Sequence, residues 1–444
     1  MTQHYYPRDF AAFILEHLRG NPTCKEWRAR TEHHRPDVVP DQLTMEGLVS
    51  ICYQASLMRE EERPVQFRLI LRPPEGFPPD EGPPDGLLRL VFSNSRPFNE
   101  NELRRLSPSV DFYRSLIGVS SDPERGLQIW GIIHSGTRWV QTVHGGGQRF
   151  DPLPASLVFY VTGPGRISAC VGLTTIATLR GGEIACPALD VFDSPWLPTM
   201  FRGEREELLS LHGEARRREG AGWAPLDPDF ARVMALHMVR RIIGIIRKVH
   251  HGGTIVFVPP ERAAEFVGEN SHFHLKYTFV DEEPRRRFRA VIVETMNTLC
   301  AVFGRDGVRR PVGWDDYVAC DDPQLARLEE KIFELAHLVA GLAGVDGAVV
   351  ITRRFEILGY GAEIAGRLGK VCSVRRALDL EGELTEPEHT EGVGTRHRSV
   401  YRLCNEIHDA IAIVVSQDGS VRFVRWKDGA VTYWDQVATS ILDF

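Results

Sequence analysis

A long helix that leads directly into a buried strand is the strongest structural signal in this chain of 444 residues. Asp322 caps free backbone N–H groups well, and Pro323 suits the first helical position. Apolar residues then recur every three or four positions from 325 to 342, and Gly344 supplies a stop. The following segment, DGAVVIT at 346–352, is typical of a buried strand. We therefore expect a helix packed against a sheet in this part of the chain.

The same alternation of helices and strands extends over residues 226–444. A helix is predicted from Asp227 to about Val249, a buried strand at 254–258 and a further helix around 288–299. The chain closes with three predicted strands, at 411–415, 421–425 and 430–434. This pattern predicts an α/β domain with a mixed β-sheet flanked by helices.

Residues 1–201 have a different pattern and predict a mixed, β-rich domain. Short apolar runs are separated by Gly, Pro and Asp, as in strands joined by turns. These runs lie at 66–72, 87–92, 127–134, 157–162, 167–171 and 174–179, and helices are expected at 7–18 and 99–106. The segment 202–225 is dense in charge, and we interpret it as a solvated helical linker between this domain and residues 226–444.

The charge and cysteine content exclude several classes of protein. The formal charge is 53 − 60 = −7, which gives no global attraction for nucleic acid or for acidic membranes. The eight cysteines form no CxxC pair, so a disulfide framework or a structural zinc site is not expected. No apolar run approaches the roughly 20 residues that span a bilayer, and the start lacks a signal-peptide pattern. These features predict a cytoplasmic protein without a membrane partner.

Two segments combine residues with possible binding chemistry, and although each alone favours a structural role, together they favour a site. Asp346 opens a buried strand, where a carboxylate can bind a divalent ion, and Gly347 with Ala348 lets a ligand approach the backbone. The alternative is an aspartate that makes a turn hydrogen bond. At 394–398, GTRHR, two guanidinium groups flank an imidazole and can bind phosphate oxygens. A solvated surface cluster is the alternative there.

Other motifs favour structural interpretations. His144 with the three glycines that follow is similar to the oxyanion loop of esterases, but no G-x-S-x-G nucleophile segment accompanies it, which favours a glycine turn. His272 and His274 can lie on one face of a strand as a metal pair. Without a third ligand at matching spacing, a surface or core pair of histidines is favoured.

The combination of the two segments resembles the diadenylate cyclase domain, whose members make cyclic di-AMP from two ATP molecules. DGA is followed about fifty residues later by GTRHR and then by the strand IAIVVS, which ends at Ser416. The resemblance covers residues from about 226 to 444. In the first domain, NELRRLSPSVDF at 101–112 and IWGIIHSG at 129–136 look like the sensor-type domain that precedes this cyclase in some bacterial proteins.

The resemblance implies roles for matching residues. Asp346 would bind Mg²⁺ or Mn²⁺ and help activate the 3′-hydroxyl of ATP, with Asp418 as a second metal carboxylate. Gly347 and Ala348 would line the nucleotide, and Ser416 would lie near it. The triphosphate would be held by four consecutive residues: Thr395, Arg396, His397 and Arg398. A homodimer or higher oligomer is also implied, because the family places one ATP per subunit face to face.

The sequence departs from the family pattern after each motif. Ser399, Val400 and Tyr401 follow RHR, where small residues are usual. Gln417 stands where many members have a carboxylate, and an amide cannot replace a carboxylate as a metal ligand. These departures motivate an alternative function, a nucleotide-binding sensor module that binds ATP or cyclic di-AMP without turnover.

Overall fold

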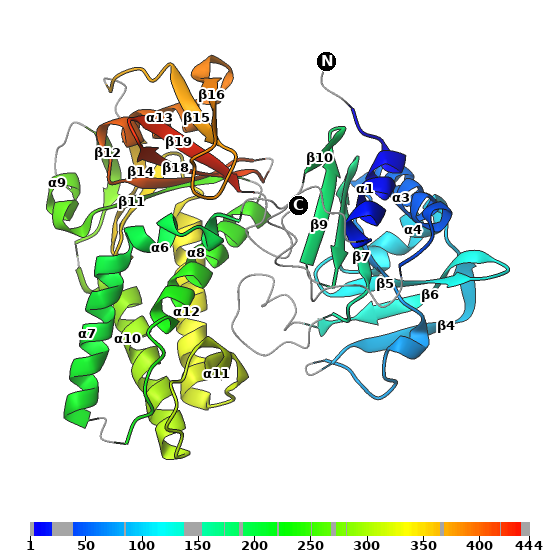
Figure 1. Ribbon diagram of the computed structural model, residues 1–444, viewed down its shortest axis with the longest axis horizontal. Coiled ribbons are helices and arrows are strands. Elements are labelled where there is room, and N and C mark those ends of the chain that lie inside the picture. Colours follow the sequence, from blue (N-terminus) through cyan, green and yellow to red (C-terminus); the bar gives the residue numbers. More distant parts are fainter. Residues whose placement is uncertain are drawn as a thin grey trace. The chain divides into compact units, whose positions relative to one another are not determined.

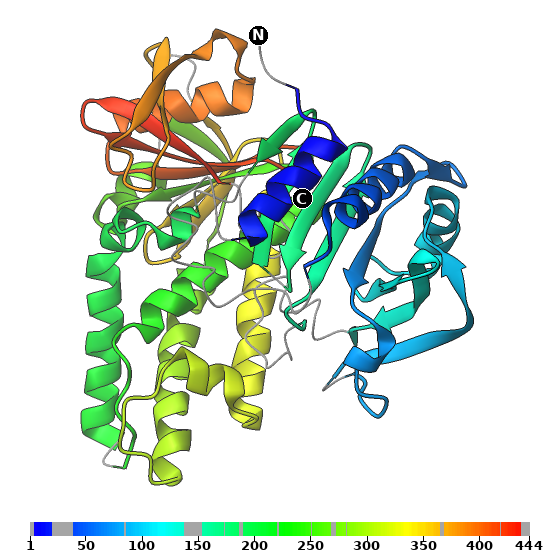
Figure 2. The same ribbon diagram turned by 45° about the vertical axis from the view of Figure 1, so that its right-hand side comes forward.

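The computed structural model describes most of the chain as two compact units (Figures 1 and 2). The boundary between the units lies between residues 185 and 190. The described ranges are 4–19, 39–83, 86–136, 153–172, 174–185, 190–219, 222–249, 251–267, 272–280, 282–364, 368–417 and 419–436. Within these ranges, every helix is too short or too polar to cross a bilayer.

The first unit contains an eight-stranded, mostly antiparallel sheet in the order β10-β9-β8-β7-β3-β5-β6-β4. Its strands are β3 (Phe67–Leu71), β4 (Leu88–Pro97), β5 (Ser115–Asp122), β6 (Gly126–His134), β7 (Leu157–Gly163), β8 (Arg166–Val171), β9 (Thr174–Arg180) and β10 (Glu183–Ala185). A separate two-stranded sheet pairs β1 (Arg59–Glu60) with β2 (Arg63–Pro64). The mixed, β-rich character predicted for this part of the chain is confirmed.

Helices cover one face of this sheet. α3 (Gln42–Ser56) packs on β7 and β8, and α1 (Pro7–Leu18) packs on α3 and β9, as Figure 1 shows. α4 (Glu100–Leu106) contacts α3 at the side. Fully buried apolar residues from helices and strands, including Phe10, Leu48, Phe67 and Phe159, fill the space between the layers. The burial of these side chains is the main source of stability in such a unit.

The second unit contains a nine-stranded mixed sheet in the order β12-β14-β13-β11-β17-β18-β19-β15-β16. The strands are β11 (Gly253–Val258), β12 (Phe273–Thr278), β13 (Ala348–Thr352), β14 (Ile357–Ile364), β15 (Ser373–Ala377), β16 (Thr385–His389), β17 (Ile411–Val415), β18 (Val421–Lys427) and β19 (Ala430–Gln436). The central strand β11 pairs in parallel with β13 and antiparallel with β17.

Helices lie on both faces of this sheet. Ile255 and Phe257 of β11 face a core formed with α8 (Phe230–Lys248), α10 (Glu282–Arg305) and α12 (Pro323–Leu342). Val256 and Val258 face the opposite core, which includes α13 (Thr395–Glu406) and α9 (Ala263–Val267). Short helices α6 (Trp196–Met200) and α11 (Trp314–Ala319) accompany the first group (Figure 1). Burial on both faces explains the continuous apolar run of β11.

The helix predicted to begin after Asp322 and the buried strand that follows it are confirmed. The carboxylate of Asp322 accepts hydrogen bonds from the N–H groups of Gln324 (2.8 Å) and Leu325 (3.4 Å), and α12 begins at Pro323. β13 follows five residues after the helix ends, and β17 spans the predicted residues 411–415. The mixed sheet flanked by helices is therefore present in residues 226–436.

The segment expected to be a linker belongs instead to the second unit. α7 (Arg202–Glu219) packs against α10 and α8. Its buried residue His212 hydrogen bonds through Nδ1 to Oδ1 of Asn297 on α10, at 2.7 Å. Leu208 and Leu209 add apolar contacts to the same core. The dense charge of this helix covers its outer side and conceals a narrow packed face.

A half-buried histidine on α8 predicts a pH dependence of stability. The ring of His237 stacks on Trp314 with centroids 4.2 Å apart, and burial, reinforced by the positive charges of Arg240 and Arg241, lowers the pKa of His237 to about 3. The unfolded chain, with an ordinary histidine pKa of about 6.5, binds more protons between these values. The free energy of unfolding should therefore fall as the pH drops below about 6.5, by up to about 1.4 kcal/mol per pH unit.

The replacement His237→Phe, which keeps a ring on Trp314, tests this pH dependence. We expect the thermal midpoint of the second unit to vary less between pH 7 and pH 5 in this variant than in the parent protein. The exposed His389, replaced in the same way, should leave the parent slope unchanged. If the thermal midpoint changed equally with pH in the parent and His237→Phe proteins, His237 would not be the source of the pH dependence.

Candidate functional site

Three strand ends meet at one edge of the nine-stranded sheet. β11 and β13 are parallel, so their first residues, Gly253 and Ala348, lie at the same edge. β17 runs in the opposite direction, and its last residue, Val415, pairs with Gly253. The DGA segment at 346–348 and Ser416 therefore come to one edge of the sheet, although about seventy residues separate them in the sequence.

The start of β13 depends on a glycine. Gly347 has a φ of +116°, and a Cβ atom at this position would lie 2.6 Å from the carbonyl carbon of Gly361 in β14 and 2.8 Å from the nitrogen of Ala362. No side chain fits where two backbones approach so closely. Asp346 is exposed at the edge and Ala348 is buried. The carboxylate of Asp346 is therefore held on a fixed backbone and is open to a ligand.

The replacement Gly347→Ala should distort the start of β13. We expect a loss of stability of about 1–3 kcal/mol, because a non-glycine residue would be strained there and would clash with β14. Gly341→Ala provides the control, since that glycine lies in the last turn of α12 and its Cβ would meet nothing within 4 Å. Thermal or denaturant unfolding should show a lower midpoint for Gly347→Ala alone. An unchanged midpoint would contradict this expectation, because it would show that β14 shifts to accommodate the added methyl group without loss of stability.

GTRHR forms the first turn of α13. Gly394 is the N-cap residue, and its carbonyl accepts a hydrogen bond from the N–H group of Arg398 at 3.2 Å. The N–H groups of residues 395–397 precede Arg398, the first helical donor, and point out of the N-terminus of the helix, where they favour anions. Val400 and Leu403 are fully buried, and α13 packs on β17 and β18. The packed face of α13 thus fixes the position of its cationic first turn.

Arg396 extends from α13 to the strand ends. Its Nη1 atom lies 3.5 Å from the carbonyl oxygen of Val415, at the limit of a hydrogen bond. A Cβ atom on Gly252, whose φ is +71°, would lie 2.5 Å from the same Nη1 atom. The absence of a side chain at Gly252 leaves room for the guanidinium group. Arg396 therefore provides a direct contact between the RHR segment and the edge that carries DGA.

The other predicted residues take different positions. Nη2 of Arg398 donates to Oγ1 of Thr395 at 3.4 Å, and the ring of His397 faces the buried Tyr401, with centroids 6.4 Å apart. Ser416 opens the turn after β17, and its N–H group donates to the carbonyl of Ser420 at 2.8 Å. Two predicted elements, Asp418 and the His144–Gly147 segment, lie outside the described residues.

Residues of β12 and β14 that the sequence did not indicate lie beside Gly347. Nζ of Lys276 binds Oε1 of Glu363 at 2.6 Å, and this hydrogen bond is the main reason why the pKa of Lys276 is raised, with a smaller contribution from Asp346. The neighbouring Tyr277 stacks on Tyr360 with centroids 4.7 Å apart. These strands therefore bring a cation and two aromatic rings to the same corner of the sheet.

The predicted histidine pair lies at the start of β12, with His272 just before the strand and His274 on it. Nε2 of His272 lies 3.6 Å from Oε1 of Glu265, and its ring packs edge-on against Phe266. In the described part of the chain, no three His, Cys, Asp or Glu side chains gather in a metal-binding cluster.

Comparison with known proteins bears on the first unit. The chain is a two-unit α/β protein, and its residues 34–134 match the family model described as "Probable sensor domain DACNV". DACNV is a probable sensor domain of diadenylate cyclases, so the match supports a sensor-type domain in the first unit. The matched region includes α3 and the strands up to β6. No curated protein and no solved structure matches the chain.

Proposed function

We propose that the second unit is a diadenylate cyclase, which condenses two ATP molecules into cyclic di-AMP and two pyrophosphates under the control of the N-terminal sensor domain. The observation that carries the proposal is the position of Arg396. It links the cationic start of α13 to the sheet edge where Asp346 is exposed. The sensor-domain match at residues 34–134 supports the same class of enzyme independently.

Each part of this edge has a role in the proposed reaction. The triphosphate would lie against the N–H groups of α13 and the guanidinium of Arg396, because both favour anions. Gly347 and Gly252 would let the nucleotide approach the backbone. The 3′-oxygen of one ATP would bond to the α-phosphorus of the other as the bond to pyrophosphate breaks. The carboxylate of Asp346 would draw the hydroxyl proton away.

The proposed metal requirement is consistent with the residues at the edge. Mg²⁺ is normally held by one or two carboxylates together with phosphate oxygens of the substrate, rather than by a complete protein cage. Asp346, exposed at an open edge, suits a Mg²⁺ or Mn²⁺ ion of this kind. When bound, the ion would neutralise charge on the phosphates and lower the pKa of the 3′-hydroxyl.

Ring closure also requires a second copy of the chain. One edge would hold one ATP, and each ATP must supply both a 3′-hydroxyl and an α-phosphate. Two copies would therefore face each other through the same surface, in a homodimer or a higher oligomer. In this arrangement, the specific activity should rise with protein concentration until the dimer is fully formed.

The product assay tests the proposal. The full chain is incubated with ATP and either Mg²⁺ or Mn²⁺, and the products are separated and identified by mass. We expect cyclic di-AMP with two pyrophosphates released per molecule. Dimeric protein that yields no cyclic di-AMP with either metal would overturn the proposal.

A nucleotide-binding module without turnover is the second candidate. It is favoured by Gln417, which lies exposed directly after Ser416 where a carboxylate would aid metal binding. It is also favoured by the buried Val400 and Tyr401 that replace small residues after RHR. Calorimetry separates the two candidates. Stoichiometric ATP binding that does not depend on metal and releases no pyrophosphate would support the binding module.

A further inference from the structure

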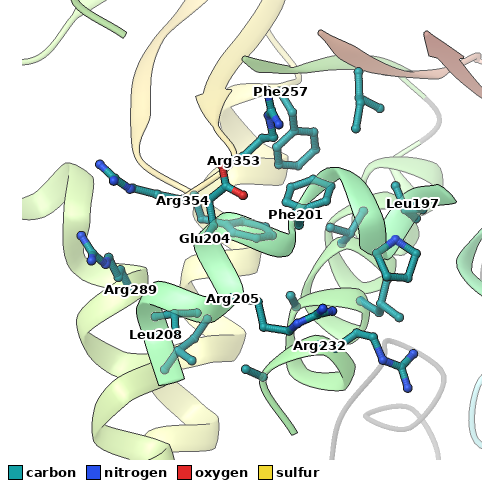
Figure 3. Close-up of a pocket in the computed structure, with 18 of the residues that line it drawn as sticks. Leu197, Phe201, Glu204, Arg205, Leu208, Arg232, Phe257, Arg289, Arg353 and Arg354 are labelled. Atoms are coloured by element: carbon teal, nitrogen blue, oxygen red, sulfur yellow. The ribbon is translucent and has the colours of Figure 1, made fainter. Parts of the chain in front are cut away.

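An open cleft lies at the opposite edge of the nine-stranded sheet from Asp346. It is bounded by α6, α7 and α8 and by the ends of β11 and β13 (Figure 3). The atom-free space measures about 790 Å³, part of it open to solvent. The cleft is thus an open recess between these helices and the strand ends.

The floor of the cleft is aromatic and aliphatic. The ring of Phe257, at the end of β11, packs edge-on against Phe201 and Phe355, with centroids 5.5 and 5.6 Å away. Leu236 of α8 and Ile413 of β17 extend the apolar lining. Water gains little in such a space, so an apolar group is its favoured occupant.

Basic side chains surround this apolar floor. In Figure 3 the labelled arginines lie around the rings of Phe201 and Phe257. The charged lining consists of Arg205, Arg232, Arg289, Arg353, Arg354 and one carboxylate, Glu204. Nη1 of Arg353 donates to the carbonyl of Met200 at 2.9 Å. This hydrogen bond holds the Arg353 side chain near the N-terminus of α7, which begins at Arg202.

Carboxylates near the cleft neutralise only part of this charge. Asp229 binds Arg232, with 3.1 Å between Oδ2 and Nη2. Glu207 is shared between Arg289 and Arg354, with 2.8 Å between its Oε2 and Nε of Arg354. The cleft has five guanidinium groups and three carboxylates, namely Asp229, Glu207 and the lining Glu204. The local net charge is therefore 5 − 3 = +2. The cleft is thus locally positive in a chain with a net charge of −7.

We propose that this cleft binds a small amphipathic anion, with a slender apolar body and one carboxylate. The apolar body would lie against the phenylalanine rings, and the carboxylate would pair with the arginines at the rim. The cleft is separate from the candidate nucleotide site. β11 joins the two, with Gly253 at one edge and Phe257 at the other, about 13 Å apart at about 3.3 Å per residue.

Calorimetry on the full chain tests the proposal, with decanoate as the probe below its micelle-forming concentration. We expect decanoate to bind at one site per chain. Decyltrimethylammonium has the same apolar body and the opposite charge, and should bind at least tenfold more weakly. Equal affinity for the two probes would overturn the role of the arginines. Failure of both to bind would overturn the proposal and would favour a protein segment as the occupant.

Two variants locate the site. Arg205→Glu should weaken decanoate binding about tenfold or more, whereas Arg202→Glu, the same change at an exposed position of α7, should not. Ala235→Trp should abolish binding by filling the cleft, with the thermal midpoint as a check on folding. Decanoate binding that survives Ala235→Trp in a folded protein would overturn the location.

The outcome is independent of the proposed cyclase reaction. Arg396→Gln alters the other edge of the sheet and should bind decanoate as the parent protein does. A loss of decanoate binding in this variant would show that the probe occupies the nucleotide site instead. The two proposals can therefore fail separately.

Discussion

Replacement of Asp346 by asparagine is expected to reduce the formation of cyclic di-AMP by at least a hundredfold. The change keeps the size of the side chain and removes the negative charge that would hold the metal and accept the hydroxyl proton. Losses of about 10²–10³ in rate are typical when one electrostatic group of an active site is removed. ATP binding should be retained, because the cations at the start of α13 are unchanged. Initial rates of product formation and ATP binding by calorimetry would measure both effects.

Asp409→Asn is the matched control for this change. Asp409 is exposed and precedes β17 at the opposite edge of the same sheet, so its loss should leave the rate of product formation unaffected. Equal rates in the Asp346→Asn and parent proteins would contradict a role for the DGA segment in the reaction.

Replacement of Arg396 by glutamine is expected to weaken ATP binding about ten- to a hundredfold. A charge-assisted hydrogen bond contributes about 1.5–3 kcal/mol, and Arg396 is a residue of α13 whose side chain reaches the strand ends. The effect should appear in the affinity for ATP as well as in the rate, in contrast to Asp346→Asn. Titration of the variant with ATP in the presence of Mg²⁺ measures the change.

Arg402→Gln tests whether this effect is specific to the first turn. Arg402 lies on the same helix, two turns beyond the N-terminus, so a general effect of positive charge on α13 would appear in both variants. We expect Arg402→Gln to bind ATP as the parent protein does. A similar loss in both variants would show that Arg396 acts through the overall charge of the helix and not through contact with the triphosphate.

The most regular elements could be predicted from sequence because local signals and burial agree there. α12 has an aspartate cap, a proline at its first position and a single apolar stripe. β11 and β17 are buried on both faces and consist almost entirely of apolar residues. These elements form the centre of the second unit, so the α/β class followed from the sequence.

Elements with weaker local signals were missed or interpreted differently. α13 begins with the polar residues TRHRS, and its buried face emerges only from Val400 onward, where the contacts come from β17 and β18. α7 was interpreted as a linker because its packed face is only a few residues wide. α3 contains Gly47 within an otherwise apolar pattern, which weakens its helical signal. In α3 and α13, tertiary packing stabilises a helix that the local sequence does not indicate, and in α7 it places an expected solvated helix in the core of the second unit.

In the candidate site, too, some features could be predicted from local sequence and others depend on tertiary contacts. The two motifs are visible in the sequence, but their approach depends on the strand order β13-β11-β17, in which sequence neighbours are not spatial neighbours. The positions of Gly252 and Lys276 in the site depend on contacts that are distant in the sequence. Gly252 adjoins Arg396, and Lys276 pairs with Glu363 of β14. Glycines at 359 and 361 of β14 were the available signal for this corner, since they mark a close approach of backbones.

The most direct test of the proposed site is an experimental structure of the full chain with a non-hydrolysable ATP analogue and Mg²⁺. The account predicts that the triphosphate lies between the first turn of α13 and the Gly252 segment, within hydrogen-bonding distance of Arg396. It also predicts that two chains face each other, so that both Asp346 carboxylates adjoin the paired nucleotides. A nucleotide bound elsewhere, or at this edge of a chain with no facing partner, would contradict the account.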